Sequence, residues 1–202
     1  WVYFAGTPSI FIRRKGGAIG CPWCNAKQTW AMDDVNRTSF VDVVSKRMDA
    51  MFSPEWAWAE PKWIVEYIVK TYKGNHVVIT GGEPCQYDLT DVTNLLEGYG
   101  YSTQIETSGA YPIQASAFTF VSVSPKISSP SDIKVIDQNV IDADEVTFAA
   151  DSEEEIEYFA KYLAGLEKPF PVVYLLPTRN MVDHEQMCIE AATEHGWRVS
   201  LD

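Results

Sequence analysis

Short runs rich in β-branched residues alternate along the chain with longer runs in which apolar residues recur every three or four positions. The clearest short run, His76-Val77-Val78-Ile79-Thr80, is almost uninterrupted in its apolar character, which is typical of a parallel strand buried on both faces. The short runs predict strands at 9–13, 76–80, 103–107, 118–123, 145–148, 172–176 and 197–201. The longer runs predict helices at 39–52, 61–72, 89–97, 152–163 and 183–195.

Local signals support several of these boundaries. Ser39 is a favourable N-cap, Pro61 suits the first turn of a helix, and Ser152 begins a capping box. The stretch 127–139 is polar and predicts irregular structure. Because strands and helices alternate without a repeat or a linker, we expect right-handed βαβ units, a mainly parallel sheet and one α/β domain over residues 1–202.

Polar motifs stand where predicted strands end. Gly81-Gly82-Glu83-Pro84 follows the strand that ends at Thr80, Glu106-Thr107-Ser108 ends the third strand, and Ser124-Pro125-Lys126 closes the fourth. Arg13 stands at the end of the first strand. Since the carboxyl ends of parallel strands share one edge of the sheet, these four stretches predict a ligand site on that rim.

Each rim residue suggests a chemistry and has a simpler alternative. Glycines 81 and 82 let backbone approach a ligand, and Glu83 can then accept a hydrogen bond from an ammonium group, although such a sequence also suits a tight turn. Lys126 is a candidate for a carboxylate or ribose contact, with a solvated loop lysine as the alternative. The planar guanidinium of Arg13 matches a carboxylate.

Two of the four cysteines form a CxxC motif in a glycine-rich loop after the first predicted strand. The spacing of Cys21 and Cys24 suggests a metal or redox site, and two buried, unreactive cysteines are the alternative. A thioredoxin-like dithiol would need the motif to open a helix. Residues 25–29 show little apolar periodicity, which disfavours that interpretation.

The composition disfavours several classes of protein. With 202 residues, 46% of them hydrophobic, the chain can bury a sizeable core. A net charge of -12 argues against broad nucleic-acid binding, which needs clustered cations. The sequence has neither a run of ~18 apolar residues nor a secretory leader pattern, and its cysteines do not form a disulfide framework. We therefore expect a cytoplasmic protein with a small-molecule ligand.

The motifs, in their order along the chain, resemble the radical S-adenosylmethionine (SAM) superfamily. More narrowly, the sequence is similar to the 7-carboxy-7-deazaguanine synthases, and the similarity covers nearly the whole chain. The Gly-Gly-Glu-Pro sequence alone is shared by many radical enzymes, whereas its combination with the later motifs is specific. The matching segments are 6–13, 20–30, 76–85, 104–109, 121–126 and 196–200.

The resemblance implies a partial (βα) barrel of mainly parallel strands, with a 4Fe-4S cluster on three cysteines and SAM on the fourth iron. It implies a radical ring contraction of 6-carboxy-5,6,7,8-tetrahydropterin to 7-carboxy-7-deazaguanine, with loss of ammonia, in queuosine and deazapurine biosynthesis. It also implies Mg²⁺, an electron donor such as flavodoxin, and a homodimer. By position it implies cluster ligation by Cys21 and Cys24, SAM contacts from Trp23, Gly82, Glu83, Ser124, Pro125 and Lys126, and pterin contacts from Arg13 and Thr80.

The sequence departs from the family pattern in the cysteine loop. The family's third cysteine falls at Gly17, and the threonine that helps to hold magnesium falls at Ala26. Cys85 matches a family cysteine that is not a ligand, and we expect Cys188 in the core. We therefore expect a synthase with poor or absent activity, in which Gly17→Cys restores the cluster if lost ligation is the only major defect. A catalytically inactive homologue that acts as a binding protein, and less strongly a CxxC thiol-disulfide oxidoreductase, are the alternatives.

Overall fold

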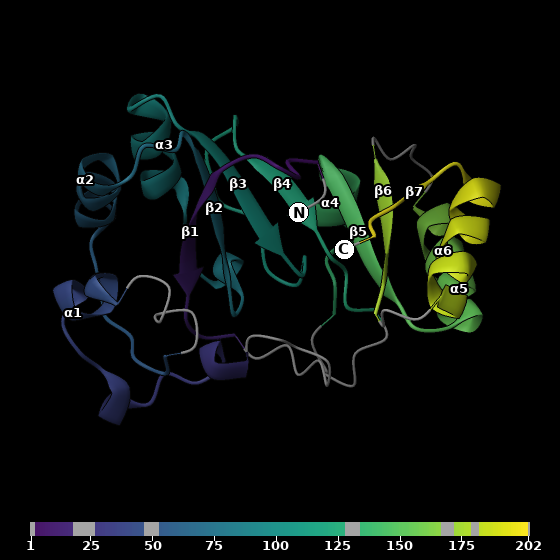
Figure 1. The fold of residues 1–202 in the computed structure, drawn as a ribbon, viewed down its shortest axis with the longest axis horizontal. Helices are drawn as coiled ribbons and strands as arrows, with labels where there is room; N and C mark the ends of the chain where they lie inside the picture. The colour runs from purple at the N-terminus through teal and green to yellow at the C-terminus, as the bar shows by residue number, and fades with distance from the viewer. Residues whose placement is uncertain are drawn as a thin grey trace.

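A seven-stranded parallel sheet organises the computed structural model, which describes residues 3–17, 27–46, 53–127, 134–166, 172–178 and 182–201. The strand order in the sheet is the order along the chain, and each neighbouring pair is parallel (Figure 1). The carboxyl ends of the strands therefore share one rim, as the sequence predicts. The strands are β1 (Ser9–Arg14), β2 (His76–Gly81), β3 (Ser102–Thr107), β4 (Phe120–Val123), β5 (Glu145–Ala150), β6 (Val173–Pro177) and β7 (Arg198–Val199).

Helices lie between successive strands and pack beside the sheet, except that β3 and β4 are joined by a segment without a helix. Figure 1 shows α2 and α3 beside the first strands, and α5 and α6 beside the last ones. The predicted N-caps are confirmed, since the hydroxyl of Ser39 accepts a hydrogen bond from the backbone N–H of Asp42, and that of Ser152 accepts one from Glu155. The carboxylate of Glu155 accepts from the N–H of Asp151, so the reciprocal bond of the predicted capping box forms one residue before Ser152. The helices are α1 (Phe40–Ser45), α2 (Pro61–Thr71), α3 (Thr90–Gly98), α4 (Asp137–Ile141), α5 (Glu153–Gly165) and α6 (Val182–His195), with 3₁₀ turns η1 (Lys27–Thr29), η2 (Asp34–Asn36) and η4 (Pro84–Gln86).

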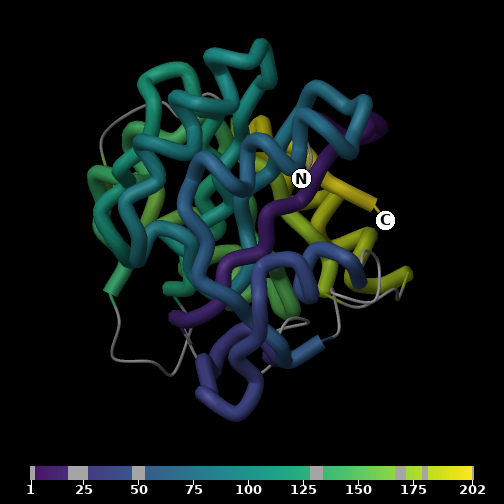
Figure 2. The backbone as a smooth tube through the Cα atoms, turned by 90° about the vertical axis from the view of Figure 1, so that its left-hand side faces the viewer, coloured from purple at the N-terminus to yellow at the C-terminus, as the bar shows by residue number. Residues whose placement is uncertain are grey.

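One face of the sheet is apolar and packs against these helices, because alternate residues of a strand point to the same face. Burial of these side chains supplies the main driving force for folding. Figure 2 looks along the sheet from the β1 end, with the later strands behind. One buried cluster joins Ile10, Val77, Ile79 and Ile105 of the sheet to Val65, Ile68, Val92 and Leu96 of α2 and α3. A second joins Val123, Val146, Phe148 and Leu175 to Ile156, Phe159, Leu163, Cys188 and Ala192 of α5 and α6.

The predicted α/β class and parallel sheet are confirmed, while some boundaries are wrong. The stretch 127–139 is not irregular throughout, because α4 begins at Asp137 and buries Val140 completely. A five-residue helix with one buried side chain leaves no periodic pattern to detect. The fourth strand begins two residues later than predicted, since Phe118 is 88% exposed. In the described residues, the helices are too short or too polar to cross a bilayer.

Candidate functional site

A row of polar side chains crosses five strands on the sheet face opposite to the helices. Arg13 lies beside Thr80 in the register, Glu106 beside Ser122, and Ser122 beside Glu145. Thr80 donates a hydrogen bond to the Glu106 carboxylate, which joins the two halves of the row. We call these five residues the polar row. They alternate with core residues such as Ile79 and Ile105, so the pleat of the strands places them on the face opposite to the helices. Thr80, Ser122 and Glu145 are buried there, and Arg13 and Glu106 are partly exposed.

Glu106 is the most perturbed acid in this row. Burial raises its pKa to about 7, and the negative charge of Glu145 adds to the effect. The hydrogen bond from Thr80 and the positive charge of Arg13 oppose the shift. A partly exposed carboxyl group with a pKa near neutral can accept hydrogen bonds from a ligand or hold a proton. In the sequence, Glu106 stands out only as part of the Glu106-Thr107-Ser108 motif, without a role of its own.

A hydrogen-bonded chain on β2 and β3 supports Glu106 from the amino-terminal side. The Oγ of Ser102 lies 2.8 Å from Nδ1 of His76, and Nε2 of His76 lies 3.0 Å from Oε1 of Gln104. Because Oε1 of an amide only accepts, Nε2 carries the imidazole proton. The amide of Gln104 then donates to Oε1 of Glu106 at 3.5 Å. The ring of Phe4 packs on His76 with 4.2 Å between centroids and covers the chain.

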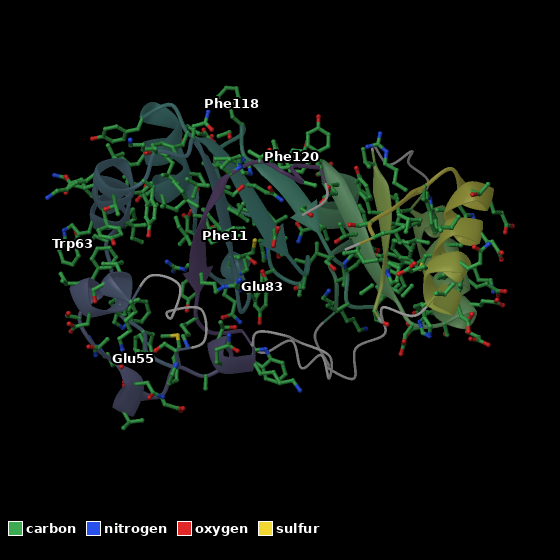
Figure 3. All side chains as sticks on the ribbon, viewed as in Figure 1. Phe11, Glu55, Trp63, Glu83, Phe118 and Phe120 are labelled. Carbon is green, nitrogen blue, oxygen red and sulfur yellow. The ribbon has the colours of Figure 1, made fainter. Side chains whose placement is uncertain are left out.

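Glu83 lies at the carboxyl-terminal rim of the sheet, where Figure 3 labels it below the strand ends. Its carboxylate is 1% exposed and accepts four hydrogen bonds from the protein. Oε1 accepts from the backbone N–H of Cys85 at 3.0 Å and from Oγ1 of Thr107 at 2.6 Å. Oε2 accepts from both the backbone N–H and the hydroxyl of Ser108. All the acceptor positions of the carboxylate are thus taken, and Glu83 ties the end of β2 to the end of β3.

The glycine pair before Glu83 makes room for the protein's own backbone. A Cβ atom on Gly81 would lie 2.2 Å from the carbonyl oxygen of Arg14, and one on Gly82 would lie 1.9 Å from that of Gly16. The N–H of Gly82 donates to Arg14, and that of Glu83 donates to Gly16. The residues that precede the cysteine loop therefore run directly against this turn.

The third rim motif contacts the second. The backbone N–H of Ser124 donates to the carbonyl of Thr107 at 2.8 Å. The ammonium of Lys126 donates to the hydroxyl of Ser124 at 2.7 Å. Two residues predicted to contact SAM, Ser124 and Lys126, are thus brought together, next to the strand end that holds Glu83. The predicted roles of Gly82, Glu83, Pro125 and Lys126 toward SAM stay predictions.

Lys15 holds the two ends of the cysteine loop together, a role that the sequence did not indicate. Its ammonium donates to the carbonyl oxygens of Gln28 at 2.6 Å, Pro54 at 3.0 Å and Ser53 at 3.2 Å. Beside it, the N–H of Gly16 donates to the carbonyl of Thr29 at 2.8 Å. Partial burial lowers the pKa of Lys15. The two ends of the loop are therefore held together and fastened to the segment at 53–54.

The predicted cluster ligands Cys21 and Cys24, with Trp23 and Ala26, lie outside the described residues. Cys85 is buried, and burial together with the charge of Glu83 raises the pKa of its thiol to about 12, which disfavours the thiolate that binds iron. In the described ranges, no three His, Cys, Asp or Glu side chains gather as a metal site would require.

The all-parallel sheet, with its polar row and three rim motifs, defines an α/β partial barrel of the radical SAM type. No family model matches the chain. The 7-carboxy-7-deazaguanine synthase of Escherichia coli (strain K12) is 36% identical over 201 residues, which cover 98% of this chain and 89% of the relative. That of Buchnera aphidicola is 32% identical over the same shares. The crystal structure of QueE from Escherichia coli matches with a TM-score of 0.92, covering 99% of this chain and 87% of its own. The chain belongs to the 7-carboxy-7-deazaguanine synthase family.

Proposed function

We propose that this chain binds the pterin substrate of its family, 6-carboxy-5,6,7,8-tetrahydropterin, and that its reaction is the ring contraction to 7-carboxy-7-deazaguanine with loss of ammonia. The polar row carries the proposal, because it places a partly exposed cation and a partly exposed carboxyl group on either side of a hydroxyl on one face of the sheet. The family membership supports it.

The row is chemically complementary to a carboxylated reduced pterin. The guanidinium of Arg13 suits the substrate carboxylate, since both groups are planar and can form two parallel hydrogen bonds. The carboxylate of Glu106 suits the N–H groups of the pterin ring. Thr80 and Gln104 each donate to Glu106 and so keep its oxygens directed along the row. In this proposal Arg13 and Glu106 orient the ring, and Thr80 acts mainly by holding Glu106.

The cofactors that the family implies fit the described residues poorly. The third cluster thiolate would come from the position of Gly17, which has no side chain, and the buried thiol of Cys85 already contacts Glu83 and Thr107. An ammonium of SAM at Glu83 would have to displace one of the four donors already there. We therefore assign no step of the reaction to the cluster, and we expect little turnover.

A second function follows from the same observation. If the glycine at position 17 leaves the cluster without its third ligand, the polar row still binds the pterin, and the protein acts as a binding protein with the synthase fold. An electron donor such as flavodoxin, Mg²⁺, a homodimer and a cytoplasmic location belong to the first proposal and rest on the family resemblance.

Anaerobic reconstitution with iron and sulfide separates these functions. The reconstituted protein is given SAM, a reductant and 6-carboxy-5,6,7,8-tetrahydropterin, and 7-carboxy-7-deazaguanine is measured by chromatography beside the Escherichia coli relative. We expect the pterin to bind and the product to form at a small fraction of the relative's rate. Turnover at the relative's rate would contradict the expected impairment, and a chain that binds no pterin would contradict both functions.

A further inference from the structure

Position 17 is closed to any side chain. Gly17 has a φ of +84°, in the left-handed region that side chains rarely adopt. A Cβ atom there would lie 2.6 Å from Cβ of Glu83, 2.8 Å from Nε2 of Gln86 and 3.0 Å from its Cδ. The first two separations are shorter than real Cβ contacts in proteins, and the third is at the limit.

Glu83 has little freedom to give way. Its Cβ is close to the backbone, and its carboxylate is held by Cys85, Thr107 and Ser108. Its backbone N–H donates to the carbonyl of Gly16 at 2.9 Å, which fixes the separation between this turn and the residue before Gly17. Moving Glu83 away from position 17 would therefore break several buried hydrogen bonds at once.

Gln86 closes the other side of position 17. It ends the 3₁₀ turn η4, and its Nε2 donates to Oη of Tyr111 at 3.0 Å. Two of the three atoms nearest to a Cβ at position 17 belong to this amide, which is the exposed end of a flexible side chain and gives way more easily than Cβ of Glu83. In contrast to Cβ of Glu83, the amide can be removed by substitution without touching the backbone.

We propose that Cβ of Glu83 and the left-handed backbone of Gly17, with the amide of Gln86 beside them, close the place from which the family's third cluster thiolate would come. A cysteine at position 17 therefore does not complete a three-thiolate site, and removing the amide of Gln86 does not change this, because Cβ of Glu83 stays in place. The inference rests on the family role proposed for the cysteine loop, and it concerns the loop alone, not the pterin row.

The steric closure of position 17 is tested first by the thermal stability of two glycine-to-alanine variants. Gly6 is a matched control, because its φ is +83° and a Cβ on it would meet no atom within 4 Å. Both Gly6→Ala and Gly17→Ala carry the backbone strain, and only Gly17→Ala adds the overlap. We expect Gly17→Ala to lower the melting temperature by about 5 °C more than Gly6→Ala does. Equal losses in the two variants would overturn the closure.

Ligation is tested by iron and sulfide content after anaerobic reconstitution of the wild type, Gly17→Cys, Gln86→Ala and Gly17→Cys/Gln86→Ala. We expect all four to bind equal amounts of iron and sulfide. A Gly17→Cys or Gly17→Cys/Gln86→Ala variant that reaches the stoichiometry and visible absorption of a 4Fe-4S cluster overturns the proposal.

The same proteins are titrated with 6-carboxypterin, an air-stable fluorescent probe for the pterin row. Loss of probe binding in the wild type would refute the proposed function and leave the iron result intact. A 4Fe-4S stoichiometry in the Gly17→Cys variant with normal probe binding would refute the closure alone. The two failures are therefore distinguishable.

Discussion

Replacing Glu106 by glutamine tests the polar row most informatively, because the change keeps the shape and removes the charge. Glu106 carries a pKa of about 7 in the folded protein, raised by burial from an ordinary value of 4.5. Between these two values the folded protein holds a proton that the unfolded chain has released. Stability therefore falls as pH rises from about 4.5 to about 7, and the full cost is present above pH 7.

The size of the effect follows from the shift. A difference of about 2.5 pKa units corresponds to an upper limit of about 3.5 kcal/mol, since each unit is worth about 1.4 kcal/mol. Glutamine is neutral at every pH and avoids this cost, but it also loses the attraction to Arg13. We expect Glu106→Gln to be more stable than the wild type by about 1 to 3 kcal/mol at pH 8 and about equal to it near pH 4.5.

Urea unfolding followed by tryptophan fluorescence at several pH values between 4.5 and 8 measures this difference. Glu157→Gln is the control, because Glu157 is exposed on α5 and pairs with Lys161 at 3.2 Å, so we expect its pH profile to follow the wild type. A Glu106→Gln variant whose stability depends on pH as the wild type's does would refute the assignment of a buried, neutral-pH carboxyl group to the row.

Two further substitutions test the supports of the rim. Glu83→Gln leaves one side-chain oxygen to accept the four hydrogen bonds that two oxygens accept in the wild type. We therefore expect the free energy of unfolding in urea to fall by about 3 kcal/mol. A variant as stable as the wild type would contradict the observed bonding. Lys15→Met removes three donations to carbonyl groups and should cost about 1 to 2 kcal/mol, with faster amide exchange confined to the segments around Thr29 and Ser53. Exchange that rises equally across the whole sheet would contradict the local role of Lys15.

Most of the fold could be predicted because its signals are local. The apolar run 76–80 marks a buried strand, and Ser152 with Glu155 marks a helix start, without any knowledge of the rest of the chain. Parallel strands then put the ends of β1 to β4 on one rim. By contrast, α4 has five residues and one buried side chain, which is too short to produce a period.

The site could be predicted only in part, because its contacts join segments distant in the sequence. Glu83 meets Thr107 and Ser108, more than 20 residues away, so a residue that looks like a free acceptor in the sequence has its oxygens occupied by the protein. Glu106 stands out only when the register places it between Thr80 and Ser122. In the sequence, Gly17 indicates only a flexible backbone in the cysteine loop. In the structure, its φ and its close neighbours leave no room for a side chain at this position.

Titration of purified protein with 6-carboxypterin at pH 8 measures whether Arg13 binds the carboxylate of a pterin, with Arg13→Met and Arg37→Met as the matched pair. Arg13 lies in the polar row, whereas Arg37 lies over the ring of Trp56, 24 residues further along the chain. We expect Arg13→Met, with a melting temperature near that of the wild type, to raise Kd by at least ~10-fold through loss of a charge-assisted hydrogen bond. We expect Arg37→Met to leave Kd unchanged. Equal affinities in the wild type and Arg13→Met, or no binding by the wild type, would contradict pterin binding by the polar row.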